Sequence, residues 1–144
     1  MSRKALALIA AVAVFVIAAI SLSTRTSPKG RVIVNCTDEY APETFYTFEF
    51  TAEKPGTLKV KLQALDSRAE IAWYICDVDK KTFNKALNEG WLSGIIYERG
   101  SGGASIQVEV DIDKSGTFTF AFVQVNRLLN SFKISVYLEF IPEG

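Results

Sequence analysis

Few side chains in this 144-residue sequence are candidates for catalysis or metal binding, and the sequence contains no histidine. Histidine is the commonest general base and the commonest metal ligand in proteins. Two cysteines, Cys36 and Cys76, remain. Cys76 has no histidine to activate its thiol, which disfavours a role as a catalytic nucleophile. The two thiols could form a disulfide in an extracytoplasmic domain, or stay as two inert buried cysteines, and the sequence leaves both open.

Two sets of carboxylates have spacings that also occur in functional sites. Residues 111–116, Asp-Ile-Asp-Lys-Ser-Gly, match the opening of a calcium loop, but the twelfth position is Phe122, where a bidentate glutamate is needed. The same run makes a good β-turn, which we favour. Asp77 and Asp79 could share a face, but paired carboxylates do acid–base work only in a shaped pocket. We therefore expect no metal, no cofactor and no catalytic residue.

The residues from Ala5 to Leu22 form an apolar segment without charge, proline or glycine. As a helix rising about 1.5 Å per residue it would span roughly 27 Å, close to the roughly 30 Å hydrocarbon core of a bilayer. A helix buried in a water-soluble domain would show a polar face, and this segment has none. We predict that residues 1–22 are a transmembrane signal anchor in the lipid bilayer. The alternative is a signal peptide cleaved near Ser23, which would release a secreted domain.

The charges are distributed unevenly along the chain. The formal net charge is zero, but five of the 16 basic residues precede residue 32 and no acidic residue does. The basic residues flank the apolar segment, where they can meet lipid headgroups. The remaining chain is acidic overall and would repel phosphates, so we expect no nucleic-acid partner. Basic residues on both sides give opposing orientation signals. The composition and turns, typical of a secreted β module, lead us to place the domain outside the cytoplasm.

Alternating apolar and polar residues predict strands after the polar linker at 23–30. Residues 57–65 alternate as expected of a half-solvated antiparallel strand. Residues 70–78 and 117–125 are apolar on both faces, which predicts central strands. About eight strands with regularly spaced turns predict an all-β, antiparallel β-sandwich of jelly-roll-like plan over residues 31–144.

The alternation breaks at residues 79–89, where we expect one short inserted helix. Asp79 suits the N-cap, Gly90 suits the stop, and two large apolar residues lie four positions apart between them. The glycine-rich run at 100–103 predicts a flexible hairpin loop. Because the insert departs from the regular sheet, we expect it to contact a partner. The predicted contact residues are Phe83, Leu87, Trp91 and Tyr97.

The closing strands resemble a known family. Residues 115–120, Ser-Gly-Thr-Phe-Thr-Phe, lead to Val125-Asn126, and a basic alternating run follows at 133–136. This pattern is similar to that of Golgi-dynamics (GOLD) type domains, in which a glycine-led aromatic strand ends in asparagine before a basic, alternating last strand. Over about residues 40–141, the resemblance implies a β-sandwich that binds partners non-covalently.

The chain also departs from that family. GOLD cargo receptors carry a cysteine in the penultimate strand, where Ala121 or a neighbour stands here, and their membrane helix lies at the carboxyl end. The apolar segment of this chain lies at the other end. Their sorting role therefore does not carry over.

Together these patterns predict a membrane-anchored, extracytoplasmic, non-catalytic module that binds a protein or an envelope component. A pilin-like or surface-layer subunit is the first alternative, although Pro28 and Gly30 would end its helix early. A hydrolase with an unrecognised site is the second alternative, and the missing histidine weighs against it.

Overall fold

The structure, a computed structural model, describes residues 30–144. The predicted membrane anchor at residues 1–22 and nearly all of the linker lie outside the described residues. In the part that is described, the helices are too short and too polar to be candidates for a membrane span. The elements follow in the order β1 (Arg31–Tyr40), β2 (Tyr46–Ala52), β3 (Gly56–Ala64), β4 (Ile71–Cys76), α1 (Lys80–Glu89), the 3₁₀ helix η1 (Leu92–Ile95), β5 (Ile96–Gly102), β6 (Ser105–Ile112), β7 (Gly116–Gln124) and β8 (Phe132–Pro142).

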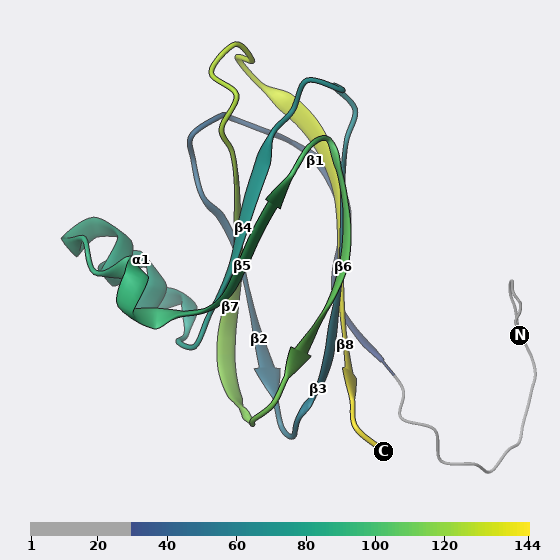
Figure 1. Ribbon diagram of the computed structural model, residues 1–144, viewed down its shortest axis with the longest axis vertical. Helices are drawn as coiled ribbons and strands as arrows, with labels where there is room; N and C mark the ends of the chain where they lie inside the picture. Colours follow the sequence, from purple (N-terminus) through teal and green to yellow (C-terminus); the bar gives the residue numbers. More distant parts are fainter. Residues whose placement is uncertain (1–29) are drawn as a thin grey trace, which may run out of the picture.

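The eight strands form two four-stranded antiparallel sheets that pack face to face (Figure 1). One sheet has the order β1-β8-β3-β6 and the other the order β2-β7-β4-β5. Every connection crosses between the sheets except the one from β4 to its neighbour β5, and α1 is inserted there. This arrangement is of the jelly-roll kind. The predicted all-β class, the two antiparallel sheets and the single short helix are confirmed for the described residues.

Alternation along the strands builds the core between the sheets. On β3, Leu58, Val60 and Leu62 are at most 1% exposed, whereas the lysines between them face outward. Fully burying a side chain of this size contributes about 1.5–3 kcal/mol. β7 adds three phenylalanines to the same core, Phe118, Phe120 and Phe122, each fully buried.

Helix α1 begins and ends where its capping residues predict. The Asp79 side chain accepts a hydrogen bond from the Thr82 amide at 2.8 Å, and Gly90 adopts φ 83° while its amide donates to the Ala86 carbonyl. The helix packs on the outer face of the β2-β7-β4-β5 sheet, forming a second apolar cluster with Cys76 and Ala121 (Figure 1). The central strands are therefore apolar on both faces because the sandwich core covers one face and α1 covers part of the other.

Most of the glycine-rich segment at residues 100–103 lies in a strand and not in the predicted flexible loop. Strand β5 continues through Gly102, and its Gly100 lies directly opposite Trp73 on β4. A Cβ atom at Gly100 would lie 2.5 Å from Cζ2 of the Trp73 ring. The glycine is needed because the indole packs against the bare backbone of the neighbouring strand.

This close approach predicts that Gly100→Ala lowers the free energy of unfolding by about 1–3 kcal/mol, because the new methyl group overlaps the Trp73 ring. Gly94→Ala is the matched control, since no atom lies within 4 Å of its Cβ position, and it should change stability by less than about 0.5 kcal/mol. Urea unfolding followed by tryptophan fluorescence measures both. Equal stabilities of the two variants would contradict the packing described.

Candidate functional site

The predicted contact residues on the insert have different environments in the structure. Phe83 is fully buried, and its ring lies edge-on to Phe45 with centroids 5.9 Å apart. It is the residue that docks α1 onto the sheet, so its prediction as a partner contact is corrected. Leu87 and Trp91 are each 37% exposed, and the Trp91 indole donates to the Glu89 carboxylate at 2.9 Å.

Tyr97 belongs to a structural contact on β5 rather than to the exposed part of the insert. Its ring lies 5.5 Å from that of Phe118, and its hydroxyl donates to Oδ1 of Asp113 at 2.6 Å and accepts from the Asp113 amide. Burial and the Asp113 carboxylate raise the pKa of Tyr97. These hydrogen bonds join β5 to the turn between β6 and β7. They also occupy the carboxylate of Asp113, one of the two aspartates in the 111–116 segment that resembles the start of a calcium loop. Within residues 30–144, no group of three or more Asp, Glu or Cys side chains is placed to hold a metal ion.

The two cysteines lie on different sheets. Cys36 is exposed on β1, and Cys76 is buried on β4 in the cluster beneath α1. Both thiols are free, so the disulfide considered from the sequence is not formed in the structure. Burial raises the pKa of the Cys76 thiol to about 11, which keeps it protonated and unreactive at neutral pH.

A different surface gathers exposed apolar side chains. We call it the loop end: the four connections β1–β2, β3–β4, β5–β6 and β7–β8, at residues 41–45, 65–70, 103–104 and 125–131, which form the upper end in Figure 1. Six large apolar side chains are strongly exposed in the described residues, and three of them, Leu65, Val125 and Leu128, lie here. Leu65 is 70% exposed and Leu128 is 81% exposed. Apolar side chains gathered at one end of a domain are typical of interaction surfaces.

A buried amide holds these loops together. Gln124, the last residue of β7, is fully buried, and its Oε1 accepts from the amides of Glu70 at 3.2 Å and Asn126 at 2.6 Å. Its Nε2 donates to the Asn126 carbonyl at 3.0 Å. The side chain thus joins the β3–β4 connection to the β7–β8 connection from inside the fold.

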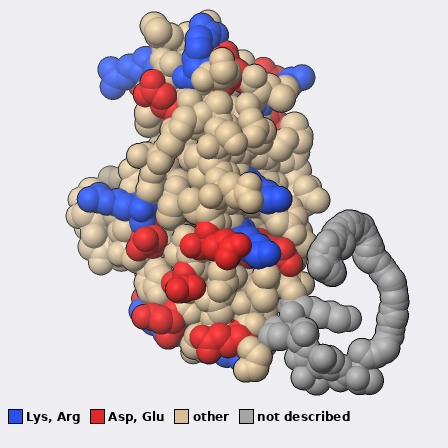
Figure 2. Space-filling model, turned by 45° about the vertical axis from the view of Figure 1, so that its right-hand side comes forward, with Lys and Arg blue, Asp and Glu red and all other residues tan. Residues whose placement is uncertain are grey.

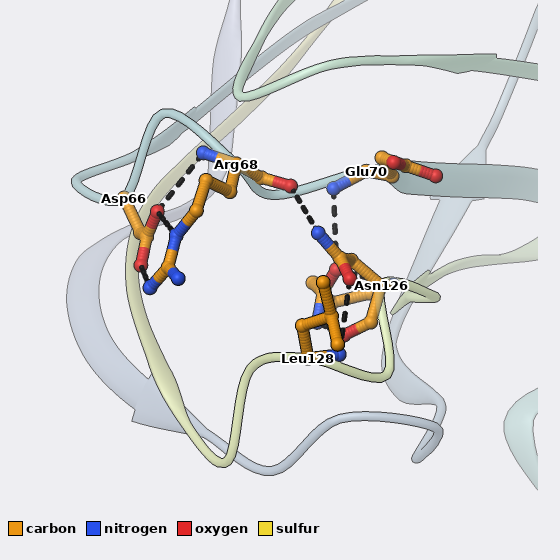
Figure 3. Close-up of polar contacts among 6 residues, drawn as sticks. Asp66, Arg68, Glu70, Asn126 and Leu128 are labelled. Atoms are coloured by element: carbon orange, nitrogen blue, oxygen red, sulfur yellow. Dashed lines mark hydrogen bonds and ion pairs between the residues drawn. The ribbon is translucent and has the colours of Figure 1, made fainter.

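Asn126 extends this joint to the surface (Figure 3). Its Nδ2 donates to the Arg68 carbonyl at 2.8 Å, and its Oδ1 accepts from the Leu128 amide at 3.0 Å. The second bond is an Asx turn, which sets the backbone direction that carries Leu128. The most exposed leucine of the loop end is therefore displayed on a loop with a fixed backbone.

Two ion pairs add charge around the leucines. Arg68 pairs with Asp66 at 2.7 Å, and its side-chain and backbone hydrogen bonds lower the pKa of Asp66 to about 2. Arg127, in the β7–β8 connection, pairs at 2.6 Å with Glu43 in the β1–β2 connection. Figure 2 shows basic and acidic side chains intermixed at this upper end. Solvent reaches both pairs, so each stabilises the fold little and can be exchanged for a partner's charges.

The sequence contains one indication of the hydrogen bonds made by Gln124, which the alternation of apolar and polar residues alone does not reveal. Gln124 follows Phe118, Phe120 and Phe122 at the same two-residue period, so a polar amide stands at an inward position. A buried amide requires hydrogen-bond partners, which predicts a loop packed over it. Leu65 and Leu128 offered no such signal, because each falls in a connection where exposure depends on the neighbouring loops.

Comparisons with known proteins do not identify a family for this chain. No family model matches the chain, and no curated protein matches it. Among solved structures, it is similar to the carbohydrate-binding module CBM36 in complex with calcium and xylotriose, with 7% identity, 76% of this chain and 92% of that chain covered, and a TM-score of 0.37. It is also similar to a family two carbohydrate esterase from Cellvibrio japonicus, with 10% identity, a TM-score of 0.33, and 76% of this chain but 35% of that chain covered. Neither likeness bears on ligand or activity, and the resemblance to GOLD-type domains stays a prediction.

The buried joint predicts the effect of Gln124→Met, which keeps the side-chain volume but removes three hydrogen bonds. We expect the free energy of unfolding to fall by about 1–3 kcal/mol, because three part-buried hydrogen bonds to the backbone are lost. Amide hydrogen exchange at Glu70 and Asn126 should accelerate. Gln107→Met on the exposed face of β6 is the control and should leave both measurements unchanged. Unaltered exchange in the Gln124 variant would show that the joint does not hold the loops.

Proposed function

We propose that the protein is a membrane-anchored, non-catalytic binding module whose loop end contacts a protein partner outside the cytoplasm. The observation that carries this proposal is Leu128, a strongly exposed leucine on a loop held by the fully buried Gln124. Ordering a loop before binding reduces the entropy lost on association, so a fixed apolar side chain is a good anchor for a partner.

The loop end replaces the insert as the preferred contact surface. The insert uses Phe83 and Ala86 to dock on the sheet, and both are fully buried. Its remaining apolar side chains, Leu87 and Trp91, are about half as exposed as Leu65 and Leu128. A partner would therefore bury more new apolar area at the loop end than at the insert.

The position of the predicted anchor agrees with this choice. Strand β1 begins at Arg31, directly after the linker, and runs to Tyr40 at the loop end. Ten residues of strand span roughly 33 Å. With residues 5–22 in a bilayer, the loop end would be the part of the domain farthest from the lipid entry point, facing a partner away from the membrane.

The chemistry of the loop end indicates the character of the partner. Leu65 and Leu128 require an apolar recess, while the guanidinium groups of Arg68 and Arg127 can meet carboxylates at its rim. Rim charges of this kind mainly affect the association rate and the choice of partner. Because the loop end also carries Glu43, Asp66 and Glu70, we propose a protein surface with an apolar recess bordered by charged residues of both signs.

A non-catalytic role is supported by the state of the groups that the sequence offered for catalysis. The Cys76 thiol is buried and protonated. Asp77 forms an ion pair with Lys114, and Asp79 caps α1. Each of these groups has a structural partner in the fold.

The exposed thiol of Cys36 provides a test of the predicted membrane topology. In intact cells or spheroplasts, a membrane-impermeant maleimide should label full-length protein at Cys36, because the domain is proposed to lie outside the cytoplasm. Cys36→Ser should abolish labelling, and Cys76 should react only after denaturation because α1 covers it. Labelling of Cys36 only after the cells are lysed would place the domain in the cytoplasm.

Site-specific crosslinking tests the contact surface. We expect full-length protein with a photoreactive amino acid at Leu128 to form a discrete adduct with one membrane or envelope protein in its native cells. The same residue at Leu87 is the matched control and should form no such adduct. With the crosslinker moved to Val125, the double variant Leu65→Ser, Leu128→Ser should reduce the adduct at least about tenfold, because the anchoring contacts are lost. An adduct at Leu87 with none at Leu128 would return the contact to the insert.

A further inference from the structure

The outer face of the β1-β8-β3-β6 sheet is an open polar surface, whereas α1 covers part of the outer face of the other sheet. Directly paired residues on neighbouring strands point to the same side, so its outward side chains stand in rows. The middle row crosses all four strands. It consists of Asn35, Tyr137, Lys61 and Gln107. The row on the loop-end side consists of Thr37, Ser135, Gln63 and Ser105. The row on the other side includes Glu139, Lys59 and Glu109.

A groove of about 380 Å³ lies on this face over β8, β3 and β6. Its polar lining residues are Lys59, Lys61, Gln107, Glu109, Tyr137 and Glu139. Two valines complete the lining, of which Val60 is fully buried and Val108 is partly buried. The groove therefore presents polar side chains above the backbone of β3 and β6, because the side chains of both valines point inward between the sheets.

The charged groups of the groove are not paired with one another. Lys59 stands directly opposite Glu109 on one side and Glu139 on the other. Side chains at such positions can touch, yet the ion pairs found within residues 30–144 join other residues. The amines of Lys59 and Lys61 and the carboxylate of Glu109 thus form no ion pair in the described residues, while Glu139 accepts a hydrogen bond from Tyr137. With two lysines and two glutamates, the groove carries no net charge and favours neither a polyanion nor a polycation.

Tyr137 lies at the centre of this surface and is held in place. Its hydroxyl donates to Oε1 of Glu139 at 2.8 Å, and Nζ of Lys61 lies 5.9 Å from its ring centroid. Burial and the Glu139 hydrogen bond raise the pKa of Tyr137 to about 12, so the phenol stays neutral. A half-buried tyrosine offers an apolar ring edge and face together with a fixed polar end.

We infer that this groove binds a neutral oligosaccharide across the strands. Sugar hydroxyls both donate and accept hydrogen bonds, and the groove supplies amine donors, carboxylate acceptors and the Gln107 amide, which does both. The ring of Tyr137 can stack on the C–H face of a sugar. Four strands spaced about 4.8 Å apart give a platform roughly 14 Å wide, enough for a short oligomer. A protein partner is less favoured here, because the outward side chains of this face are mostly polar and the strongly exposed Val32 lies at its edge, on β1.

This site is separate from the loop end and does not depend on it. The groove lies on a sheet face, and none of its lining residues belongs to the loop connections. An anchored domain with both surfaces would hold an envelope glycan on one face while its loops engage a protein.

Glycan binding by the full-length protein in detergent micelles tests the inference. The probes are immobilised neutral oligomers of glucose, xylose, mannose and N-acetylglucosamine, together with sulfated oligosaccharides, followed by calorimetric titration of any neutral oligomer that binds. We expect at least one neutral oligomer to bind. Tyr137→Ala should weaken that binding at least about tenfold, and Tyr137→Phe, which keeps the ring, less than about threefold.

Two further variants keep the result interpretable. Gln107→Ala, on the exposed side of β6, should weaken binding by about threefold to tenfold even if Tyr137→Ala fails to fold. Leu128→Ser should leave glycan binding unchanged, so failure of this inference and failure of the loop-end proposal are distinguishable. The inference is overturned if no neutral oligomer binds at millimolar concentration, if only sulfated probes bind, or if folded Tyr137→Ala and Gln107→Ala bind as well as the unmodified protein.

Discussion

Burial of strand β7 on both of its faces is the constraint on which the rest of the structure depends. Its inner face carries Phe118, Phe120 and Phe122 into the space between the sheets, and its outer face meets α1 through Ala121. The strand must therefore lie in the interior of its sheet, with β2 and β4 on either side. Its last residue, Gln124, continues the inward row and carries an amide to the end of the core. One strand thus positions the core, the helix and the loops that close the domain.

A polar side chain at the end of an apolar row has a specific consequence. An unpaired amide buried there would be costly, but fully bonded it restricts every group that it touches. Gln124 bonds to backbone groups of two connections, and Asn126 passes the restraint to Leu128. The same end of the domain therefore combines a hydrogen-bonded backbone with exposed apolar side chains. The proposed function depends on this combination, because an ordered loop lowers the entropic cost of binding and exposed apolar side chains supply the area to bury.

The two outer faces of the sandwich differ in composition and in how they are covered. The β2-β7-β4-β5 sheet presents Cys76 and Ala121 outward, and α1 covers them. The β1-β8-β3-β6 sheet presents lysines, glutamates, amides and hydroxyls, which are stable in water without a cover. The inserted helix thus covers apolar side chains of one sheet, whereas the outer face of the other sheet has no such cover in the described residues.

The sequence by itself determined the strands, their inward residues and the capped helix. A two-residue period forces alternate side chains to opposite faces, and Asp79 and Gly90 satisfy the ends of α1 whatever surrounds them. It also indicated which strands lie centrally, since β4 and β7 are apolar on both sides. Only the tertiary structure decided that Phe83 is covered while Leu128 is not, that Cys36 and Cys76 lie on different sheets, and that Asn35, Tyr137, Lys61 and Gln107 form one row. Exposure and cross-strand register depend on contacts between residues far apart in the chain, and a local pattern carries no information about them.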